Sequence, residues 1–311
     1  MIILKKKIYF GISLGLLGCF PSTTHAQQDP QYTNYMYNHS NINPAYAGSR
    51  EGFSIFGLYR TQWVGLEGAP KTATLSADTP LGRSGLGLGV NFTNDRIGAM
   101  DENTLSVDLS YAVELNPEYK LAFGLKGSGN LLNVDYSKLS IYDQSDPVVS
   151  DNVENKFSPN LGLGLFLYSE KAYVGLSAPS LLTRSRYDDN NLSTLRQRMH
   201  LYVTGGYVFD LTYNLKFKPA AMVKMVEGTP LQVDLSANFM FREKFTVGAA
   251  YRWDSSVSGL VGFQATENIM IGYSYDAETS KLARYNSGSH EVFLRFNLFN
   301  GFKRVAAPRF F

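Results

Sequence analysis

The chain has little of what marks several common protein classes. Its 311 residues include one cysteine, Cys19, so a disulfide framework cannot form within it. The formal net charge is only +2, from 29 basic and 27 acidic residues, and no basic patch indicates nucleic-acid binding. No apolar run approaches the ~18 residues that a membrane-spanning helix needs. If this chain enters a membrane, strands must cross it.

Residue patterns that support catalysis or metal binding are also missing. Among the histidines, His39, His200 and His290 have no metal-ligand spacing to another histidine, cysteine or carboxylate pair. The G-x-S-x-G elbow of serine hydrolases is absent, and the glycine-rich runs do not precede helices. The acidic residues near Asp143 and Asp151 lack EF-hand spacing, which favours a solvated loop. The sequence therefore predicts no enzyme, cofactor or metal site.

The N-terminus has the organisation of a secretory signal peptide. Lys5–Lys7 precede a short apolar run, and Thr24-His25-Ala26 follows as a cleavage site. Cleavage after Ala26 removes the only cysteine and three lysines, leaving 26 basic and 27 acidic residues. A lipoprotein cleavage box at Leu16–Cys19 is the alternative, although Leu17 fits it poorly. The prediction is a signal peptide over residues 1–26.

The strongest pattern in the chain is an alternation of apolar and polar residues. In the stretch 104–113 the odd positions are Leu, Val, Leu, Tyr and Val, while Ser106, Asp108 and Ser110 separate them. Alternate side chains of a strand point to opposite faces, so this strand has one apolar and one polar face. The same pattern recurs over 231–239. The apolar face points inward in a soluble sandwich and outward, toward lipid, in an outer-membrane barrel.

The connections between strands decide between these two folds. Alternation and turn residues predict about fourteen strands. They lie near 52–63, 71–78, 84–94, 103–113, 119–131, 157–168, 172–178, 198–209, 214–226, 231–241, 244–253, 257–265, 268–276 and 288–298. Every even-numbered connection is tight, whereas the odd-numbered ones include the long loops 132–156, 179–197 and 277–287. Transmembrane barrels have short turns at one rim and long loops at the other.

We therefore predict a transmembrane antiparallel β-barrel over residues 52–299 in the outer membrane. Residues 27–51 form an N-terminal periplasmic or plug segment, and residues 300–311 form a C-terminal tail that ends in Phe310-Phe311. An even strand number places both termini in the periplasm. Fourteen strands leave a lumen too wide for the wall side chains alone to fill, so we expect the segment 27–50 to fold at the periplasmic mouth or into the barrel.

Strand parity predicts which face each residue occupies. The predicted lipid-facing residues are Leu86, Leu88, Val90, Phe92, Leu121, Phe123, Leu125, Leu161, Leu163, Leu165 and Leu167. The predicted lumen-facing residues are Lys120, Lys126, Asp108, Asp234, Lys216, Lys224, Arg252 and His200. Gly85, Gly87, Gly89, Gly162 and Gly164 also fall on the inner face, where a glycine lets another backbone approach closely.

Two segments are more elaborate than a generic barrel requires. The first is YMYN at 35–38 followed by NPAYAG at 43–48, whose Asn-Pro and Ala-Gly pairs form turns. The second is YRTQWVGLEGAP at 59–70, which ends the first strand at a rim where Trp63 would lie at headgroup level. A structural interpretation, with a tethered terminus and a girdle tryptophan, competes with a role in partner binding.

At these residues the chain resembles the PorP/SprF family. The resemblance rests on QDPQYTNYMYN and NPAYAG near the N-terminus, on YRTQWVGLEGAP with TLSADTPL, and on SHEVFLRFNLF at 289–299. It extends from Gln27 to Phe299. The resemblance implies an outer-membrane barrel of the type IX secretion machinery of gliding and protein-secreting Bacteroidetes. Members work with periplasmic lipoproteins of the machine, or with the C-terminal domain of one large secreted adhesin.

We therefore expect a non-enzymatic docking protein whose partners are the lipid bilayer, type IX components and an adhesin domain. Neither nucleic acid nor a small-molecule substrate is expected. The expected partner-binding residues are Tyr35, Tyr37, Asn43, Pro44, Tyr46 and Gly48 in a periplasmic docking element, and Trp63, Gly68 and Pro70 at the opposite rim. The alternative is a small-solute diffusion channel whose selectivity is set by inward lysines such as Lys120 and Lys216. A secreted soluble β-protein is a third possibility.

Overall fold

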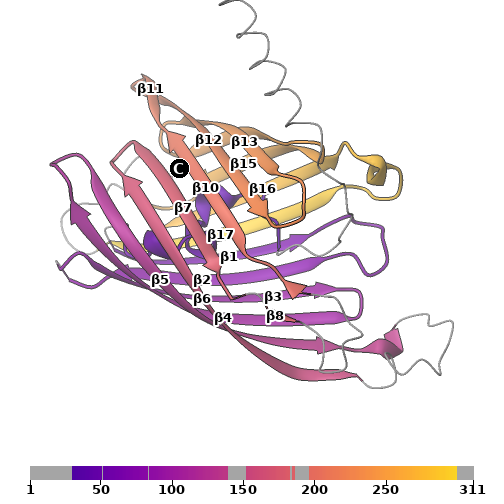
Figure 1. Ribbon diagram of the computed structural model, residues 1–311. Helices are drawn as coiled ribbons and strands as arrows, with labels where there is room; N and C mark the ends of the chain where they lie inside the picture. Colours follow the sequence, from indigo (N-terminus) through magenta and orange to yellow (C-terminus); the bar gives the residue numbers. More distant parts are fainter. Residues whose placement is uncertain are drawn as a thin grey trace, which may run out of the picture.

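Fourteen antiparallel strands form the wall of a closed barrel in the computed structural model (Figure 1). The structure describes residues 30–50, 52–82, 84–138, 152–182, 184–185 and 196–299. The wall strands are β1 (Gly52–Thr61), β2 (Lys71–Pro80), β3 (Leu86–Ile97), β4 (Met100–Glu114), β5 (Lys120–Val134), β6 (Val153–Tyr168), β7 (Ala172–Ser180), β10 (His200–Tyr207), β12 (Leu215–Val226), β13 (Gln232–Phe241), β14 (Phe245–Arg252), β15 (Ser256–Gln264), β16 (Ile269–Glu278) and β17 (Ser289–Phe299). The prediction of about fourteen strands is confirmed.

Pairing of the first and last strands closes the barrel. β1 pairs with β17 over ten residues, from Gly52 opposite Phe299 to Thr61 opposite His290. β11 (Phe209–Thr212) continues β10 beyond Val208 and pairs with β12, while β8 (Arg184–Ser185) and β9 (Arg196–Gln197) form a separate two-stranded ladder. Closure removes the sheet edges, so every wall strand has a partner on both sides.

The alternation in the sequence becomes an apolar outer face and a polar inner face. On β4 the side chains of Leu105, Val107 and Leu109 are exposed on the outside, while Ser106 and Asp108 between them are buried. The predicted lipid-facing residues all lie on the outer face, fully or partly exposed, which confirms their assignment. The predicted inward residues Asp108, Lys126, Lys224, Asp234, Arg252 and His200 are buried in the lumen.

The two remaining predicted lumen residues lie at the rim. Lys120 and Lys216 have inward parity, but they sit at strand ends, where they pair with Glu114 and Glu243 at 2.7 and 2.6 Å. Both glutamates are largely exposed. These two lysines therefore belong to the edge of the barrel and not to its interior.

The two ends of the barrel differ in the length of their connections. At one end the connections are 81–85, 115–119, 169–171, 213–214, 242–244 and 265–268; we call this end the short-turn mouth. The other end, the long-loop mouth, has 62–70, 135–152, 181–199 and 279–288 as well as shorter connections. The predicted separation of short and long connections is confirmed. Tight connections on alternate pairs keep neighbouring strands in register.

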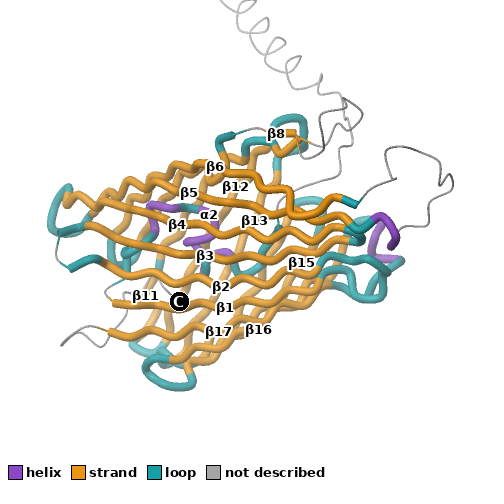
Figure 2. The backbone as a smooth tube through the Cα atoms, turned by 90° about the horizontal axis from the view of Figure 1, so that it is seen from below, coloured by secondary structure: helices purple, strands orange, loops and turns teal. Residues whose placement is uncertain are grey.

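The barrel interior contains the N-terminal part of the described chain. Residues 30–50, which we call the lumen segment, fold into η1 (Tyr35–Tyr37), α2 (His39–Ile42) and η2 (Pro44–Tyr46) between the walls (Figure 2). Nearly all of these residues are buried. The largest hydrophobic core joins the lumen segment to the inner wall through Tyr35, Met36 and Tyr37 packed with Phe56, Phe293 and others.

Short helical turns complete the described structure. They are η3 (Tyr136–Lys138) and η5 (Lys281–Arg284), both in connections at the long-loop mouth. Among the described residues, no helix has the length and hydropathy required to span a membrane. The predicted signal peptide and the predicted C-terminal tail lie outside the described residues and stay predictions.

Candidate functional site

Three charged wall residues form a buried cluster in the lumen near the long-loop mouth. Arg60 on β1, Asp276 on β16 and Glu291 on β17 come from three adjacent strands, and each has an inward position. Arg60 Nη2 lies 2.7 Å from Asp276 Oδ2, and Arg60 Nη1 lies 3.1 Å from Glu291 Oε2. We call these three residues the latch, because the lumen segment is bonded to all of them.

The latch holds two residues of the lumen segment. The backbone N–H groups of Thr33 and Asn34 donate to the two carboxylate oxygens of Glu291 at 3.1 and 2.8 Å. The Thr33 hydroxyl accepts from Arg60 at 3.0 Å and donates to Asp276 at 2.7–2.8 Å. A carboxylate that accepts several charge-assisted hydrogen bonds is strongly held, so Glu291 fixes the segment at this level of the lumen.

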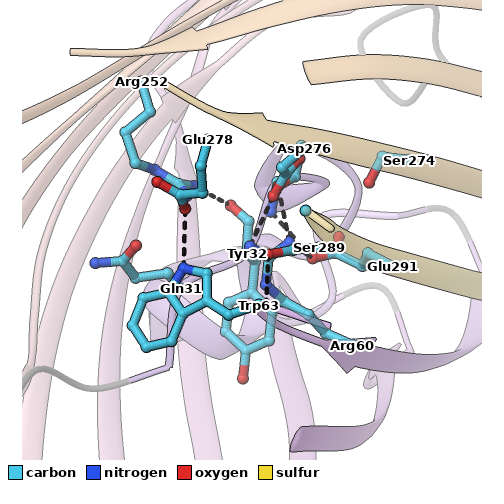
Figure 3. A network of polar contacts seen from close by, with 12 residues as sticks. Gln31, Tyr32, Arg60, Trp63, Arg252, Ser274, Asp276, Glu278, Ser289 and Glu291 are labelled. Atoms are coloured by element: carbon cyan, nitrogen blue, oxygen red, sulfur yellow. Dashed lines mark hydrogen bonds and ion pairs between the residues drawn. The ribbon is translucent and has the colours of Figure 1, made fainter. Parts of the chain in front are cut away.

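Further polar contacts surround the latch at the long-loop mouth. The Trp63 indole N–H donates to Glu278 at 2.9 Å (Figure 3). The Gln31 side chain donates to Gln232 at 3.1 Å. Arg252 is bonded to Asp234 at 2.6 Å and also donates to the backbone carbonyl of Tyr32 at 3.3 Å. The start of the lumen segment is thus attached to β13, β14, β16 and β17, as well as to β1.

The middle of the lumen segment packs on cationic side chains. Arg295 donates to the backbone carbonyl of Tyr37, and its guanidinium lies 5.4 Å from the centre of the Tyr37 ring. The ring also lies 4.8 Å from that of Phe293. Burial raises the pKa of Tyr37 to about 12 and raises that of Tyr35 as well, because a phenolate would lose its hydration in the packed lumen. Opposite them, Lys126 pairs with Asp108 at 3.3 Å and lies 3.4 Å from the backbone carbonyl of Ser40.

Residues 43–48, the end of the lumen segment near the short-turn mouth, are shaped by their own sequence; we call them the inner end. The Asn43 side chain accepts from the Ala45 N–H at 3.0 Å, and Pro44 occupies the first position of η2, as expected for a capped helical turn. The Asn43 amide also donates to the carbonyl of Leu165 on β6 at 3.0 Å. Gly48 has φ +68°, so the turn that follows η2 requires a residue that tolerates the left-handed region.

Inner-face glycines let this end lie directly on the wall. We call Gly87, Gly124 and Gly164 the glycine seat. A Cβ on Gly124 would lie 2.1 Å from the Ala45 nitrogen, and one on Gly87 would lie 2.2 Å from the Ala47 carbonyl oxygen. One on Gly164 would meet Asn43 Oδ1 at 2.1 Å. Of the predicted inward glycines, Gly87, Gly89 and Gly164 lie against the lumen segment, whereas Gly85 and Gly162 lie against backbone of the wall strands.

The structure separates the predicted partner-binding residues into two groups. Tyr35, Tyr37, Asn43, Pro44 and Tyr46 are buried in the lumen against the wall, and Gly48 lies beside them in its tight turn. In this arrangement these residues hold the segment in place and present no surface at the short-turn mouth. A role in partner binding stays a prediction for them.

The second group lies in the connection 62–70 at the long-loop mouth. Gly68 has φ +71° and its carbonyl accepts from the Gly98 N–H at 2.9 Å, while the Pro70 carbonyl accepts from the Gln62 N–H at 2.9 Å. Trp63 differs from its expected place at headgroup level, because its indole turns toward inward-facing Glu278 (Figure 3). Its backbone φ of +46° lies in the left-handed region, and its side chain is half-buried.

Sequence reasoning missed the latch itself. Arg60, Asp276 and Glu291 have inward strand parity, so the sequence could have predicted that each of them faces the lumen. Their proximity depends on β1 lying beside β17, a contact between the two ends of the barrel sequence. Among the described residues, no group of three or more potential metal ligands is arranged to hold an ion.

Comparison with known proteins gives the family. A family model described as "Type IX secretion system membrane protein PorP/SprF" matches residues 24–296, which is most of the chain. The chain belongs to the PorP/SprF family. This PorP/SprF protein is thereby a type IX secretion membrane protein, and its barrel places it in the outer membrane. No match to a curated protein was found.

Solved structures similar to this PorP/SprF protein share its architecture. The toluene transporter TbuX from Ralstonia pickettii has a TM-score of 0.51 at 12% identity, with 90% of this chain and 96% of that chain covered. The monoaromatic hydrocarbon channel CymD has a TM-score of 0.51 at 13% identity, covering 86% of this chain and 94% of that chain. At such low identity the similarity shows the fold alone.

Proposed function

We propose that this PorP/SprF protein is a plugged, non-enzymatic docking barrel that holds a type IX partner at its long-loop mouth. The observation that carries the proposal is the lumen segment, which runs through the barrel from the latch to the glycine seat. A diffusion channel needs a continuous polar path, whereas this segment is bonded to opposite sides of the wall. Its buried ion pairs and close backbone contacts favour a fixed plug.

The long-loop mouth offers the surface for docking. In barrels of this kind the short turns face the periplasm and the long loops face the cell exterior. The connection 62–70 carries exposed Val64 and Glu67 beside the bonded Trp63, so it combines an ordered backbone with free side chains. An exported adhesin domain reaches this mouth from outside, while a periplasmic lipoprotein reaches only the short turns.

Affinity purification in mild detergent tests the proposal. The tagged native chain is compared with a variant carrying serine at Val64, Leu66 and Glu67, and with a matched variant carrying serine at Leu115 and Glu118 in a short turn. We expect a type IX component or cargo to co-purify with the native chain and the short-turn variant, and to be lost from the first variant. If no type IX protein co-purifies with any of the three, the docking function is wrong.

The second candidate function is small-solute diffusion. One observation favours it: a polar cavity lies beside the lumen segment near the long-loop mouth. The residues that line it include Asn91, Thr93, Asp95, Glu102, Lys126, Asn130 and Tyr202. The cavity is bounded on one side by Asn41 and Ile42 of the lumen segment. Diffusion through the barrel would require the segment to move away from the wall at this level.

A further inference from the structure

We infer that the lumen segment enters the barrel from the mouth that faces the cell exterior, so that Pro30 and Gln31 belong to the outer surface of the cell. The start of the segment then lies beside the long loops. The even strand number, by contrast, predicts an N-terminus in the periplasm. The inference concerns the path of the chain and does not depend on the docking function.

Contacts along β17 give the direction of the segment. Thr33 and Asn34 bond to Glu291, the Tyr37 ring packs on Phe293, and the Tyr37 carbonyl accepts from Arg295. Residues 291, 293 and 295 follow one another on the inner face, and β17 runs from the long-loop mouth at Ser289 to the short-turn mouth at Phe299. Four residues of strand span roughly 13 Å, so the segment descends through the barrel in step with β17.

Contacts on the opposite wall give the same direction. Pro30 lines the cavity near the long-loop mouth together with Glu102 and Asn130, which lie close to the long-loop ends of β4 and β5. At the other end, the Ala47 carbonyl accepts from Ser110 at 2.6 Å, near the short-turn end of β4. The described ends, Pro30 and Phe299, therefore lie at opposite mouths of the barrel.

The start of the segment is also accessible at its mouth. Pro30 and Gln31 are partly exposed, whereas the residues from Tyr32 to Ser40 are buried. Pro30 and Phe299 are the ends of the described chain, and the position of the two termini themselves stays a prediction. If the lumen segment begins at the outer face, a protein outside the cell can reach its start without crossing the membrane. A periplasmic protein meets only the buried end of the segment near the short-turn mouth.

Cysteine labelling on intact cells tests this path, because the chain has a single cysteine. In a Cys19→Ser background, Pro30→Cys is compared with Tyr285→Cys in a long loop and with Glu118→Cys in a short turn. The reagent is a polyethylene glycol maleimide too large to pass through porins. Full labelling of each variant after denaturation in detergent supplies the reference.

We expect Pro30→Cys to be labelled on intact cells to the same extent as Tyr285→Cys, and Glu118→Cys to be labelled only after the membrane is opened. Gln31→Cys replaces Pro30→Cys if the latter is poorly produced. The inference is overturned if the Pro30 or Gln31 variant is labelled on intact cells no more than Glu118→Cys. It is also overturned if Glu118→Cys is labelled on intact cells and Tyr285→Cys is not, because the barrel then has the reverse orientation.

Discussion

The two ends of the lumen segment are held by different physical interactions. At the end near the long-loop mouth, which is the outer end under our inference, Thr33 and Asn34 are bonded to the buried charges of Arg60, Asp276 and Glu291. At the inner end, residues 43–48 lie on glycines with backbone almost touching backbone, and few charges are involved. One end is fixed by charge complementarity and the other by shape.

The difference indicates which changes each end tolerates. A buried charge network fails when one member is removed, because its partners are left without compensation. A close-packed backbone contact is insensitive to charge but cannot accept added volume, because a backbone has no alternative rotamer. Substitutions can therefore release either end separately. Removal of a charge should release the outer end, and added side-chain volume should release the inner end.

The largest expected effect comes from breaking the latch. Arg60→Met leaves Asp276 and Glu291 as buried, unpaired carboxylates and should lower the free energy of unfolding by about 3–5 kcal/mol. The measurement is urea unfolding of the detergent-solubilised barrel. Lys120→Met is the matched control, because its pair with Glu114 is exposed and screened by solvent, so its loss should change stability little.

A triple variant sharpens this prediction. Combining Arg60→Met with Asp276→Asn and Glu291→Gln removes all three charges and should recover much of the lost stability, since neutral side chains leave no uncompensated charge. A triple variant that is less stable than Arg60→Met alone would contradict the charge-based account of the outer end.

The next effect is overpacking of the glycine seat. Gly124→Leu places side-chain atoms where Ala45 lies and should cost about 1–3 kcal/mol or detach the inner end. Limited proteolysis of residues 43–50 reports detachment. Gly127→Leu is the control on the same strand, because nothing lies within 4 Å of its Cβ position. Equal behaviour of the two variants would mean that the segment does not rest on Gly124.

A smaller effect is expected at the cap of η2. Asn43→Ala removes both the acceptor for the Ala45 N–H and the donor to Leu165, and should cost about 1–2 kcal/mol. Ser280→Ala, which removes the cap of η5 in a connection at the long-loop mouth, should cost less, because η5 has no buried residues. Thermal unfolding in detergent compares them, and equal costs would argue against a buried role for Asn43.

The smallest effect appears only at high pH. Burial raises the pKa of Tyr37 from 10.0 to about 12, so its contribution to stability is complete below pH 10 and is lost as the pH rises through 12. Tyr37→Phe should flatten the decline of stability between these pH values, and other buried phenols whose pKa is raised, such as Tyr32 and Tyr35, contribute to the decline that is left. An unchanged slope would show that the Tyr37 ring is solvated.

Much of the fold could be predicted from the sequence because its determinants are local. The alternation around Asp108 and the tight connections reveal strand number, facing and the two kinds of mouth, since each depends on neighbouring residues. The inward glycines likewise indicated a close backbone approach. The hydrogen bond between Trp63 and Glu278 could not be predicted, because a pairing of two residues 215 positions apart leaves no trace in an apolar–polar pattern.

The path of the lumen segment could not be predicted in the same way. Residues 30–50 have no strand or helix periodicity that gives them a direction. The sequence therefore did not decide whether this segment folds at the periplasmic mouth or into the barrel. The latch depends on contacts between Thr33 and Glu291, 258 residues apart in the chain. Only closure of β1 on β17 brings these residues together.

Single-channel recording tests the central claim, that the lumen segment closes the barrel, most directly. The full mature chain in a planar bilayer is compared with a variant that lacks residues 27–48. The account predicts near-silence for the full chain and a large, steady conductance for the deletion variant. A large, steady conductance of the full chain, unchanged by the deletion, would contradict it.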